Sequence, residues 1–144
     1  SERRNLEAMD ALRREQEAKE QAIINASMQE KKAAEEERLL KLMQTKNLFP
    51  RLQCQSGNEV FSYTINKPLV TLGRDTDNDV SFANNQTVSS HHAEIIFNGS
   101  AFEVFNRSRS YAQGIIVNGQ FYQQYTLRSG DIIGLGEAIV TFYT

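Results

Sequence analysis

The first 46 residues of the chain contain no aromatic residue, no glycine and no proline. All five tyrosines, eight phenylalanines, eight glycines and two prolines fall in residues 47–144. Without large apolar side chains of this kind, residues 1–46 cannot build a core of their own. We therefore expect two parts: a long charged helix over residues 1–46 and one globular domain over residues 47–144.

Clustered positive charge is also missing. Residues 1–46 carry ten acidic and ten basic side chains, and the other residues carry eight acidic and six basic ones, which gives a net charge of -2. Sites for nucleic acid or anionic membranes need clustered Lys and Arg side chains. No apolar run approaches the roughly 20 residues of a membrane helix. We therefore expect no nucleic-acid partner and no membrane insertion of this segment.

Cysteine and histidine are scarce. Cys54 is the only cysteine, so no disulfide can form within the chain, and this is typical of a reducing compartment such as the cytoplasm. The two histidines, His91 and His92, are adjacent and lack the paired spacing of zinc ligands. The stretch DTDNDV, Asp75 to Val80, begins like a calcium loop, but Val80 stands where such a loop needs glycine. We expect a cytoplasmic protein with neither a metal nor a cofactor.

Residues 2–46 are built mainly of Ala, Glu, Lys, Arg, Gln, Leu and Met, which lose little freedom in a helix. Asn47 can adopt the left-handed cap conformation, and Pro50 cannot continue a helix. A seam of alternating three- and four-residue steps from Met9 to Leu40 has apolar residues at six of its ten positions. The helix could be a solvated spacer, a coiled coil that joins two or more chains, or a helix packed on its own domain.

Beyond Pro50 the hydrophobic period changes from 3.6 to 2, and short β-branched and aromatic runs alternate with turn residues. Runs at this spacing, with no helical pattern between them, predict an antiparallel β-sandwich. The predicted strands cover residues 51–55, 59–65, 69–74, 79–82, 93–98, 101–106, 114–118, 121–127, 131–136 and 138–143.

Two kinds of connection stand out between these strands. The asparagine-glycine pairs at residues 98–99 and 118–119 predict two-residue type I′ turns, because both central positions of that turn need positive φ. The connection from Ala83 to His92 is long for a compact sandwich, and loops of this length are often functional.

The long connection contains the stretch VSSHHAEI, Val88 to Ile95. Neighbouring residues of an extended chain point to opposite sides, so the two histidines cannot both face Ser89 or Ser90. No G-x-S-x-G nucleophile elbow surrounds these serines. We therefore expect that the protein is not an enzyme.

Recognition of an anion fits these residues better than catalysis. Arg74 follows Gly73 at the end of a predicted strand, and Ser89 offers a hydroxyl from the long connection. A guanidinium and a hydroxyl suit a phosphate dianion, because charge-assisted bonds from arginine are strong and match two oxygens. An ion pair of Arg74 with Asp75 or Asp77 is an equal alternative on spacing alone.

Four motifs in order resemble the forkhead-associated (FHA) domain. This resemblance implies a mainly β fold of the SMAD/FHA type, an eleven-stranded β-sandwich whose loops at one end bind phosphothreonine in a partner protein. The long helix lies outside it. The motifs are TLGRDTDNDV at residues 71–80, VSSHHAEI at 88–95, GIIVNGQ at 114–120 and LRSGDIIGLG at 127–136.

By position in these motifs, the resemblance implies that Arg74 and Ser89 hold the phosphate. Two positions depart from the family pattern: Gln113 replaces an asparagine that binds the peptide backbone, and Ala112 replaces a frequent Ser or Thr. The further peptide contacts would be Ser90, His91, Gln113 and Asn118, with Gly73, Gly114 and a buried His92 supporting the site and His91 facing solvent.

Two functions therefore compete. The first is a non-enzymatic phosphothreonine-binding adaptor in Ser/Thr kinase signalling, with the helix as spacer or as the element that makes a homo-oligomer. The second is a structural component of a secretion, pilus or cytoskeletal assembly that binds its partner without phosphorylation.

Overall fold

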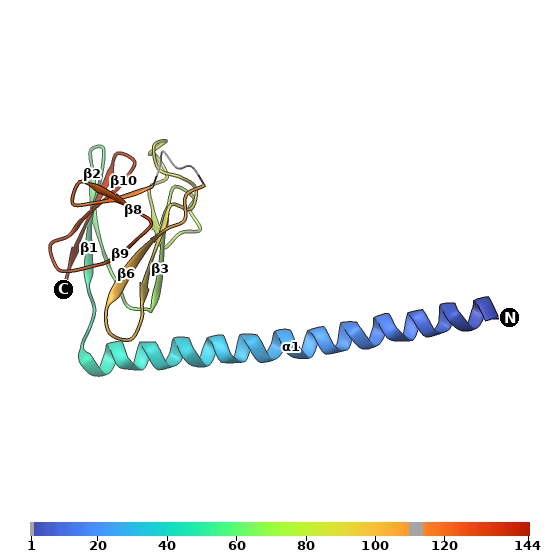
Figure 1. Ribbon diagram of the computed structural model, residues 1–144. Helices are drawn as coiled ribbons and strands as arrows, with labels where there is room; N and C mark the ends of the chain where they lie inside the picture. Colours follow the sequence, from blue (N-terminus) through green and yellow to red (C-terminus); the bar gives the residue numbers. More distant parts are fainter. Residues whose placement is uncertain (1, 110–113) are drawn as a thin grey trace. The chain divides into compact units, whose positions relative to one another are not determined.

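The computed structural model describes residues 2–109 and 114–144. Within these ranges the chain forms one long helix, α1 (Glu2–Lys46), and eleven strands (Figure 1). It divides into two compact units, residues 1–38 and residues 39–144. The predicted sandwich with an N-terminal helix is thus confirmed. Among the described residues, no helix has the length and apolarity needed to cross a membrane.

The second unit is a sandwich of two sheets, with strand order β2-β1-β11-β10-β7-β8 in one and β4-β3-β5-β6-β9 in the other. The paired strands run antiparallel except for β3 and β4, which are parallel. The strands are β1 (Arg51–Ser56), β2 (Glu59–Thr64), β3 (Leu69–Gly73), β4 (Val80–Ser81), β5 (Ala93–Phe97), β6 (Phe102–Asn106), β7 (Ile115–Val117), β8 (Gln120–Tyr122), β9 (Gln124–Thr126), β10 (Ile132–Leu135) and β11 (Ala138–Tyr143).

The predicted strand over residues 121–127 is two strands that belong to different sheets. Tyr122 at the end of β8 and Tyr125 in β9 both pack against the core, with ring centroids 4.8 Å apart. Residues three apart in one continuous strand would face opposite sides. The chain therefore leaves one sheet at Gln123 and joins the other.

One of the two predicted type I′ turns is confirmed. Asn118 and Gly119 have φ values of 51° and 87°, as that turn requires. The turn between β5 and β6 is different, because Asn98 pairs with Ala101 and only Gly99, with φ 100°, lies in the positive region. The Asn98 side-chain oxygen accepts hydrogen bonds from the amides of Ser100 and Ala101. The central residues of this turn are therefore 99–100, one position later than predicted.

The helix ends as the sequence predicts. Asn47 has φ 54°, and the Leu48 N–H donates to the Met43 carbonyl at 2.8 Å, the bond of a Schellman cap. Met43 is fully buried in the sandwich core, and Leu39 and Leu42 pack against it. The last turns of α1 therefore belong to the same compact unit as the sandwich.

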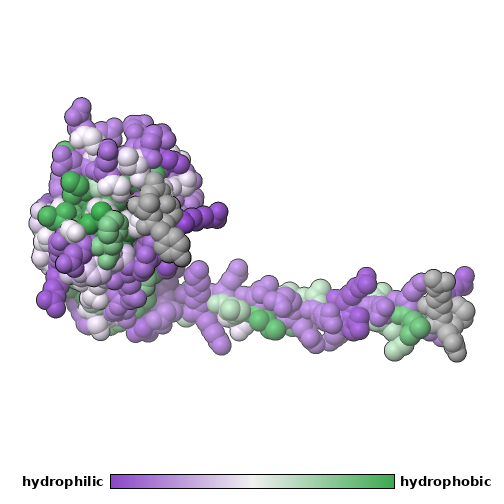
Figure 2. All heavy atoms as spheres, turned by 45° about the horizontal axis from the view of Figure 1, so that its top comes forward, coloured by the Kyte–Doolittle hydropathy of each residue, from purple (hydrophilic) through white to green (hydrophobic). Residues whose placement is uncertain are grey.

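From residue 4 to residue 38 the side chains of α1 are exposed. Ion pairs three or four residues apart, such as Lys19 with Glu15, line its surface. Leu6, Met9 and Ile23 are each more than 60% exposed. Figure 2 shows such apolar side chains on the helix as separate patches between polar ones. Whether this helix is a spacer or joins chains stays a prediction.

Asp79 joins the start of β4 to the middle of β3. Its carboxylate accepts bonds from Lys67 and from the amide and hydroxyl of Thr71. Burial disfavours the charged form, but the bonds from Lys67 and Thr71 outweigh burial and hold the pKa of Asp79 below its ordinary value. This contact fixes the strand that leads into Gly73.

We expect Asp79→Asn to reduce stability at neutral pH and to change its pH dependence. A carboxyl with a lowered folded pKa contributes stability above its unfolded pKa of about 3.9, and the contribution is lost as pH falls through the folded value. Urea unfolding at pH 7 and pH 3 measures this. The difference in free energy of unfolding between wild type and Asp79→Asn should be smaller at pH 3 than at pH 7. An equal difference at both pH values would refute the role of Asp79.

Candidate functional site

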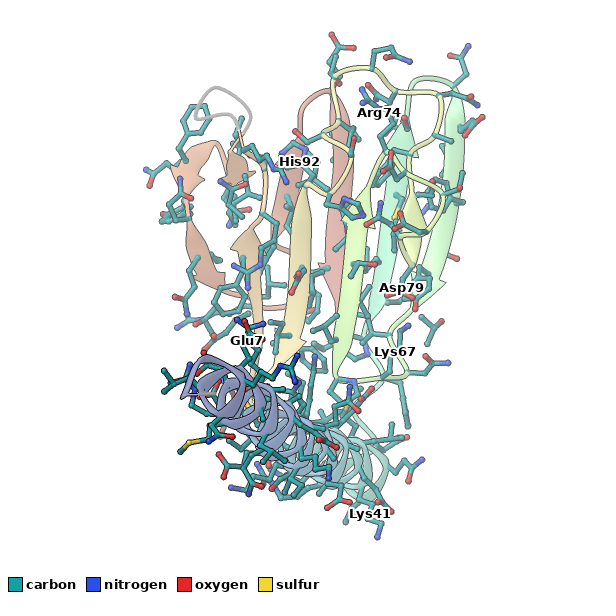
Figure 3. The ribbon with its side chains drawn as sticks, turned by 90° about the vertical axis from the view of Figure 1, so that its right-hand side faces the viewer. Glu7, Lys41, Lys67, Arg74, Asp79 and His92 are labelled. Atoms are coloured by element: carbon teal, nitrogen blue, oxygen red, sulfur yellow. The ribbon has the colours of Figure 1, made fainter. Side chains whose placement is uncertain are left out.

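The predicted phosphate-binding residues meet at the loop end of the sandwich. A cavity of about 600 Å³ opens there. Figure 3 shows Arg74 among these loops, His92 deeper between the strands, and Asp79 and Lys67 toward the other end of β3. The cavity is lined by Arg74, Val88, Ser89, Ser90, His91, Arg107 and Arg109.

Gly73 allows the two main loops of the site, residues 74–79 and residues 83–92, to contact each other. A Cβ atom at this position would lie 2.3 Å from the Ser90 carbonyl oxygen and 2.8 Å from the Asn78 side chain. In the space thus left, the Arg74 amide donates to the Ser89 carbonyl at 2.9 Å and the Asp75 amide to the Ser90 carbonyl at 3.2 Å. Glycine is required here for close approach of two backbones.

Asn78 secures the same contact from the side, and the sequence reasoning missed it. Its side chain is buried, and its amide nitrogen donates to the carbonyls of Asp75 and Ser90, both at 2.8 Å. The only signal for Asn78 in the sequence is its position in the motif TLGRDTDNDV. Its role is to fix the shape of the loop that follows Arg74.

The guanidinium of Arg74 has only neutral partners in the described part of the chain. It lies 3.5 Å from the Gln86 side-chain oxygen and 3.4 Å from the Ser90 hydroxyl, long distances for hydrogen bonds. Neither Asp75 nor Asp77 forms an ion pair with it, although on spacing alone such an ion pair was as strong an alternative as anion binding. The positive charge of Arg74 is therefore available to an anion in the cavity.

His92 connects the long loop to the start of β7. The ring is fully buried. Its Nδ1 accepts the Ser89 amide at 3.1 Å, and its Nε2 lies 3.3 Å from the Gly114 carbonyl oxygen. These partners assign the neutral tautomer with the proton on Nε2, which donates to Gly114. His92 thus positions the backbone of Ser89 from inside the domain.

His91 is exposed, but it is engaged with the neighbouring loop. Its Nε2 lies 3.1 Å from a carboxylate oxygen of Asp77. Asp75, Asp77 and His91 each offer one ligand atom within 4.8 Å of the others, and all three are exposed. Exposed acidic groups at a loop are common without a metal, so we assign no cation to this group.

Comparisons with known proteins agree with this geometry. The family profile of the FHA domain matches residues 70–136, which include both main loops of the site. The chain contains an FHA domain. No curated protein resembles the chain closely enough to count as a match.

Solved structures of other FHA domains superpose on the sandwich. One, described as a structural and functional study of phosphothreonine-dependent FHA domain interactions, is 25% identical, with a TM-score of 0.59 over 67% of this chain and 96% of that one. The FhaA FHA domain, complexed with the intracellular domain of Rv3910, is 26% identical, with a TM-score of 0.57 over 65% and 98% of the two chains. Mycobacterium tuberculosis EmbR, in complex with a low-affinity phosphopeptide, is also 26% identical, with a TM-score of 0.57 over 66% of this chain and 24% of EmbR.

Two cavity residues of this FHA domain were not among the predicted site residues. Arg107 and Arg109 follow β6 and lie outside the four motifs. Arg107 Nε is 3.4 Å from a carboxylate oxygen of Glu94, and its guanidinium lies 5.1 Å from the Phe105 ring centroid. Arg109 is exposed and has no ion pair within the described residues. The only signal for these two residues in the sequence is the stretch RSRS at residues 107–110, which places two arginines close together.

Asn118 does not lie at the cavity of the FHA domain, contrary to prediction. It occupies the turn after β7, whereas Gly114 at the other end of β7 contacts His92. Its side chain donates to Asp131 at 2.9 Å and accepts the Ile132 amide at 3.0 Å. Asn118 therefore holds the turn between β7 and β8. Gln113 and Ala112 lie outside the described residues.

We expect His92→Ala to lower the free energy of unfolding by about 2–4 kcal/mol, because it removes two buried hydrogen bonds and leaves a cavity. The matched control is His91→Ala, an exposed change that should alter stability by less than about 0.5 kcal/mol. Urea unfolding measures both. Equal midpoints for His92→Ala and wild type would show that the ring does not brace the loops.

We expect Gly73→Ala to displace the Ser90 carbonyl and to cost about 1–3 kcal/mol, the range for forcing atoms into a packed site. Gly134→Ala is the control, because its Cβ would meet Ile116 at 3.4 Å, an ordinary contact. Amide NMR spectra should show Ser89 and Ser90 shifted in the first variant alone. Unshifted loop amides in Gly73→Ala would contradict the close approach.

Proposed function

We propose that this FHA domain binds phosphothreonine in a partner protein and does not catalyse a reaction on it. The supporting observation is the Arg74 guanidinium, which faces a cavity with no protein carboxylate as partner in the described residues. A phosphothreonine carries a charge of about -1.5 to -2 at pH 7 and three strong acceptor oxygens. Such a group would replace the long contacts of Arg74 with short charge-assisted bonds.

Four of the cavity residues have a role in this proposal. Arg74 and the Ser89 hydroxyl bind phosphate oxygens, and His92 holds Ser89 in place. Ser90 and His91 line the same cavity and contact the peptide beside the phosphothreonine. Gln113 is proposed as a further peptide contact from its motif position alone.

The relatives support a phosphorylated ligand. The relative at 25% identity takes part in phosphothreonine-dependent interactions, and EmbR at 26% identity was solved with a phosphopeptide. The proposed partner is therefore a substrate of a Ser/Thr kinase, and the protein serves as an adaptor in the cytoplasm. If α1 also joins two chains, two weak sites on one scaffold gain avidity through effective concentration.

A decisive test compares paired phosphothreonine and threonine peptides, chosen by a phosphopeptide-library screen, in a fluorescence anisotropy titration. We expect only the phosphorylated peptide to bind, and Arg74→Ala to weaken binding by about 1.5–3 kcal/mol, the range for hydrogen bonds to charged groups. Arg51→Ala, on β1 beside Tyr143, removes the same charge elsewhere and should bind normally.

The same titration tests the competing assembly function. The departures at Ala112 and Gln113 favour it, because they remove the residues that the family pattern places beside the peptide. Equal affinity for both peptides, unchanged in Arg74→Ala, would favour a partner that is bound without phosphorylation and would end the phosphothreonine proposal.

A further inference from the structure

Among the described residues, the lining of the cavity at the loop end includes three arginines and no acidic residue. Arg74 comes from the end of β3, while Arg107 and Arg109 come from the segment after β6. The cavity thus receives guanidinium groups from two separate loops. At about 600 Å³ it is much larger than one phosphate group.

A single phosphate does not neutralise the positive charge of the arginines that line the cavity. Glu94, 3.4 Å from Arg107 Nε, offsets part of the Arg107 charge, and the carboxylates of Asp75 and Asp77 lie on the other side, beside Arg74 and His91. Arg109 is offset by no carboxylate of the described residues. One phosphothreonine supplies a charge of about -1.5 to -2 against three guanidinium groups. A positive charge remains on the side of the cavity formed by Arg107 and Arg109.

Buried or clustered like charges are unfavourable, so a ligand gains most by supplying the missing anion. We infer that the site selects peptides with a second anionic group, a carboxylate or a second phosphate, close to the phosphothreonine, and that Arg107 and Arg109 bind this group. The inference rests on the proposed phosphothreonine binding and adds which residues the site prefers beside the phosphothreonine. The planar fork of arginine matches both carboxylate and phosphate oxygens.

The test uses synthetic peptides with one phosphothreonine among neutral residues. In one series an aspartate replaces each neighbouring residue in turn, with the asparagine peptide as its neutral match. In a second series a phosphoserine replaces the same residues, with the serine peptide as its match. Dissociation constants are measured by anisotropy for wild type, Arg109→Gln and the double variant Arg107→Gln/Arg109→Gln. Arg128→Gln is the matched control, because Arg128 is exposed in the turn before β10 and does not line the cavity.

We expect the best anionic peptide to bind about fivefold to tenfold tighter than its neutral match, as for partly exposed charge-assisted contacts. This advantage should fall below about twofold in Arg109→Gln and in the double variant, persist in Arg128→Gln, and shrink with added salt. The singly phosphorylated neutral peptide should bind all four proteins within about twofold. A gain with aspartate means that a carboxylate suffices, and a gain with phosphoserine alone means that a second phosphate is required.

Three results would overturn the inference. If the neutral phosphopeptide binds but no anionic neighbour improves it, the second subsite is absent while the proposed function stands. If Arg109→Gln weakens the neutral and anionic peptides equally, Arg109 binds the phosphothreonine itself. If no phosphopeptide binds at all, both proposals fall. Arg107 also contacts Glu94 and Phe105, so thermal unfolding of the double variant is measured alongside, and Arg109→Gln alone keeps the test independent of any loss of fold.

Discussion

The site depends on one buried residue that holds four segments of the chain together. The backbone of His92 donates to the Leu72 carbonyl at 2.9 Å and accepts the Arg107 amide at 2.8 Å, while its ring contacts Ser89 and Gly114. The end of β3, the long loop, the end of β6 and the start of β7 are thereby fixed to a single point. Loops that are far apart in sequence can present side chains to one ligand only when their backbones are held in this way.

Two potentially reactive side chains of the domain are buried and engaged in the fold. The only cysteine of the chain, Cys54, lies in the core, where burial raises the pKa of the thiol to about 12 and keeps it protonated at neutral pH. Both ring nitrogens of His92 contact backbone groups, those of Ser89 and Gly114. What the cavity does offer is positive charge on preorganised loops, which favours an anionic ligand at little cost in ordering.

The sequence predicted those features that depend on neighbours along the chain. The helix end at Asn47, the turn at residues 118–119 and most strand positions follow from local pattern and turn chemistry. The motif residues Gly73 and His92 were found because their spacing resembles a known family. The contacts around them, from Asn78 to Gly114, then follow from the sandwich topology.

Features that depend on the meeting of distant segments were missed. Nothing local says that Arg107 and Arg109 reach the cavity, since this follows from the pairing of β5 with β6. Asn118 was placed at the site by its motif, although the turn that contains it lies at the other end of β7. The single run FYQQYTL at residues 121–127 likewise gives no local sign of the change of sheet between β8 and β9.

The central claim is that Arg74 and Ser89 converge on one phosphate. A crystal structure of the domain with a bound phosphothreonine peptide tests it most directly. We predict phosphate oxygens within hydrogen-bond distance of both the Arg74 guanidinium and the Ser89 hydroxyl, with His92 still bonded to Ser89 and Gly114. A phosphate bound elsewhere on the sandwich, or a peptide whose phosphate contacts neither group, would contradict the account.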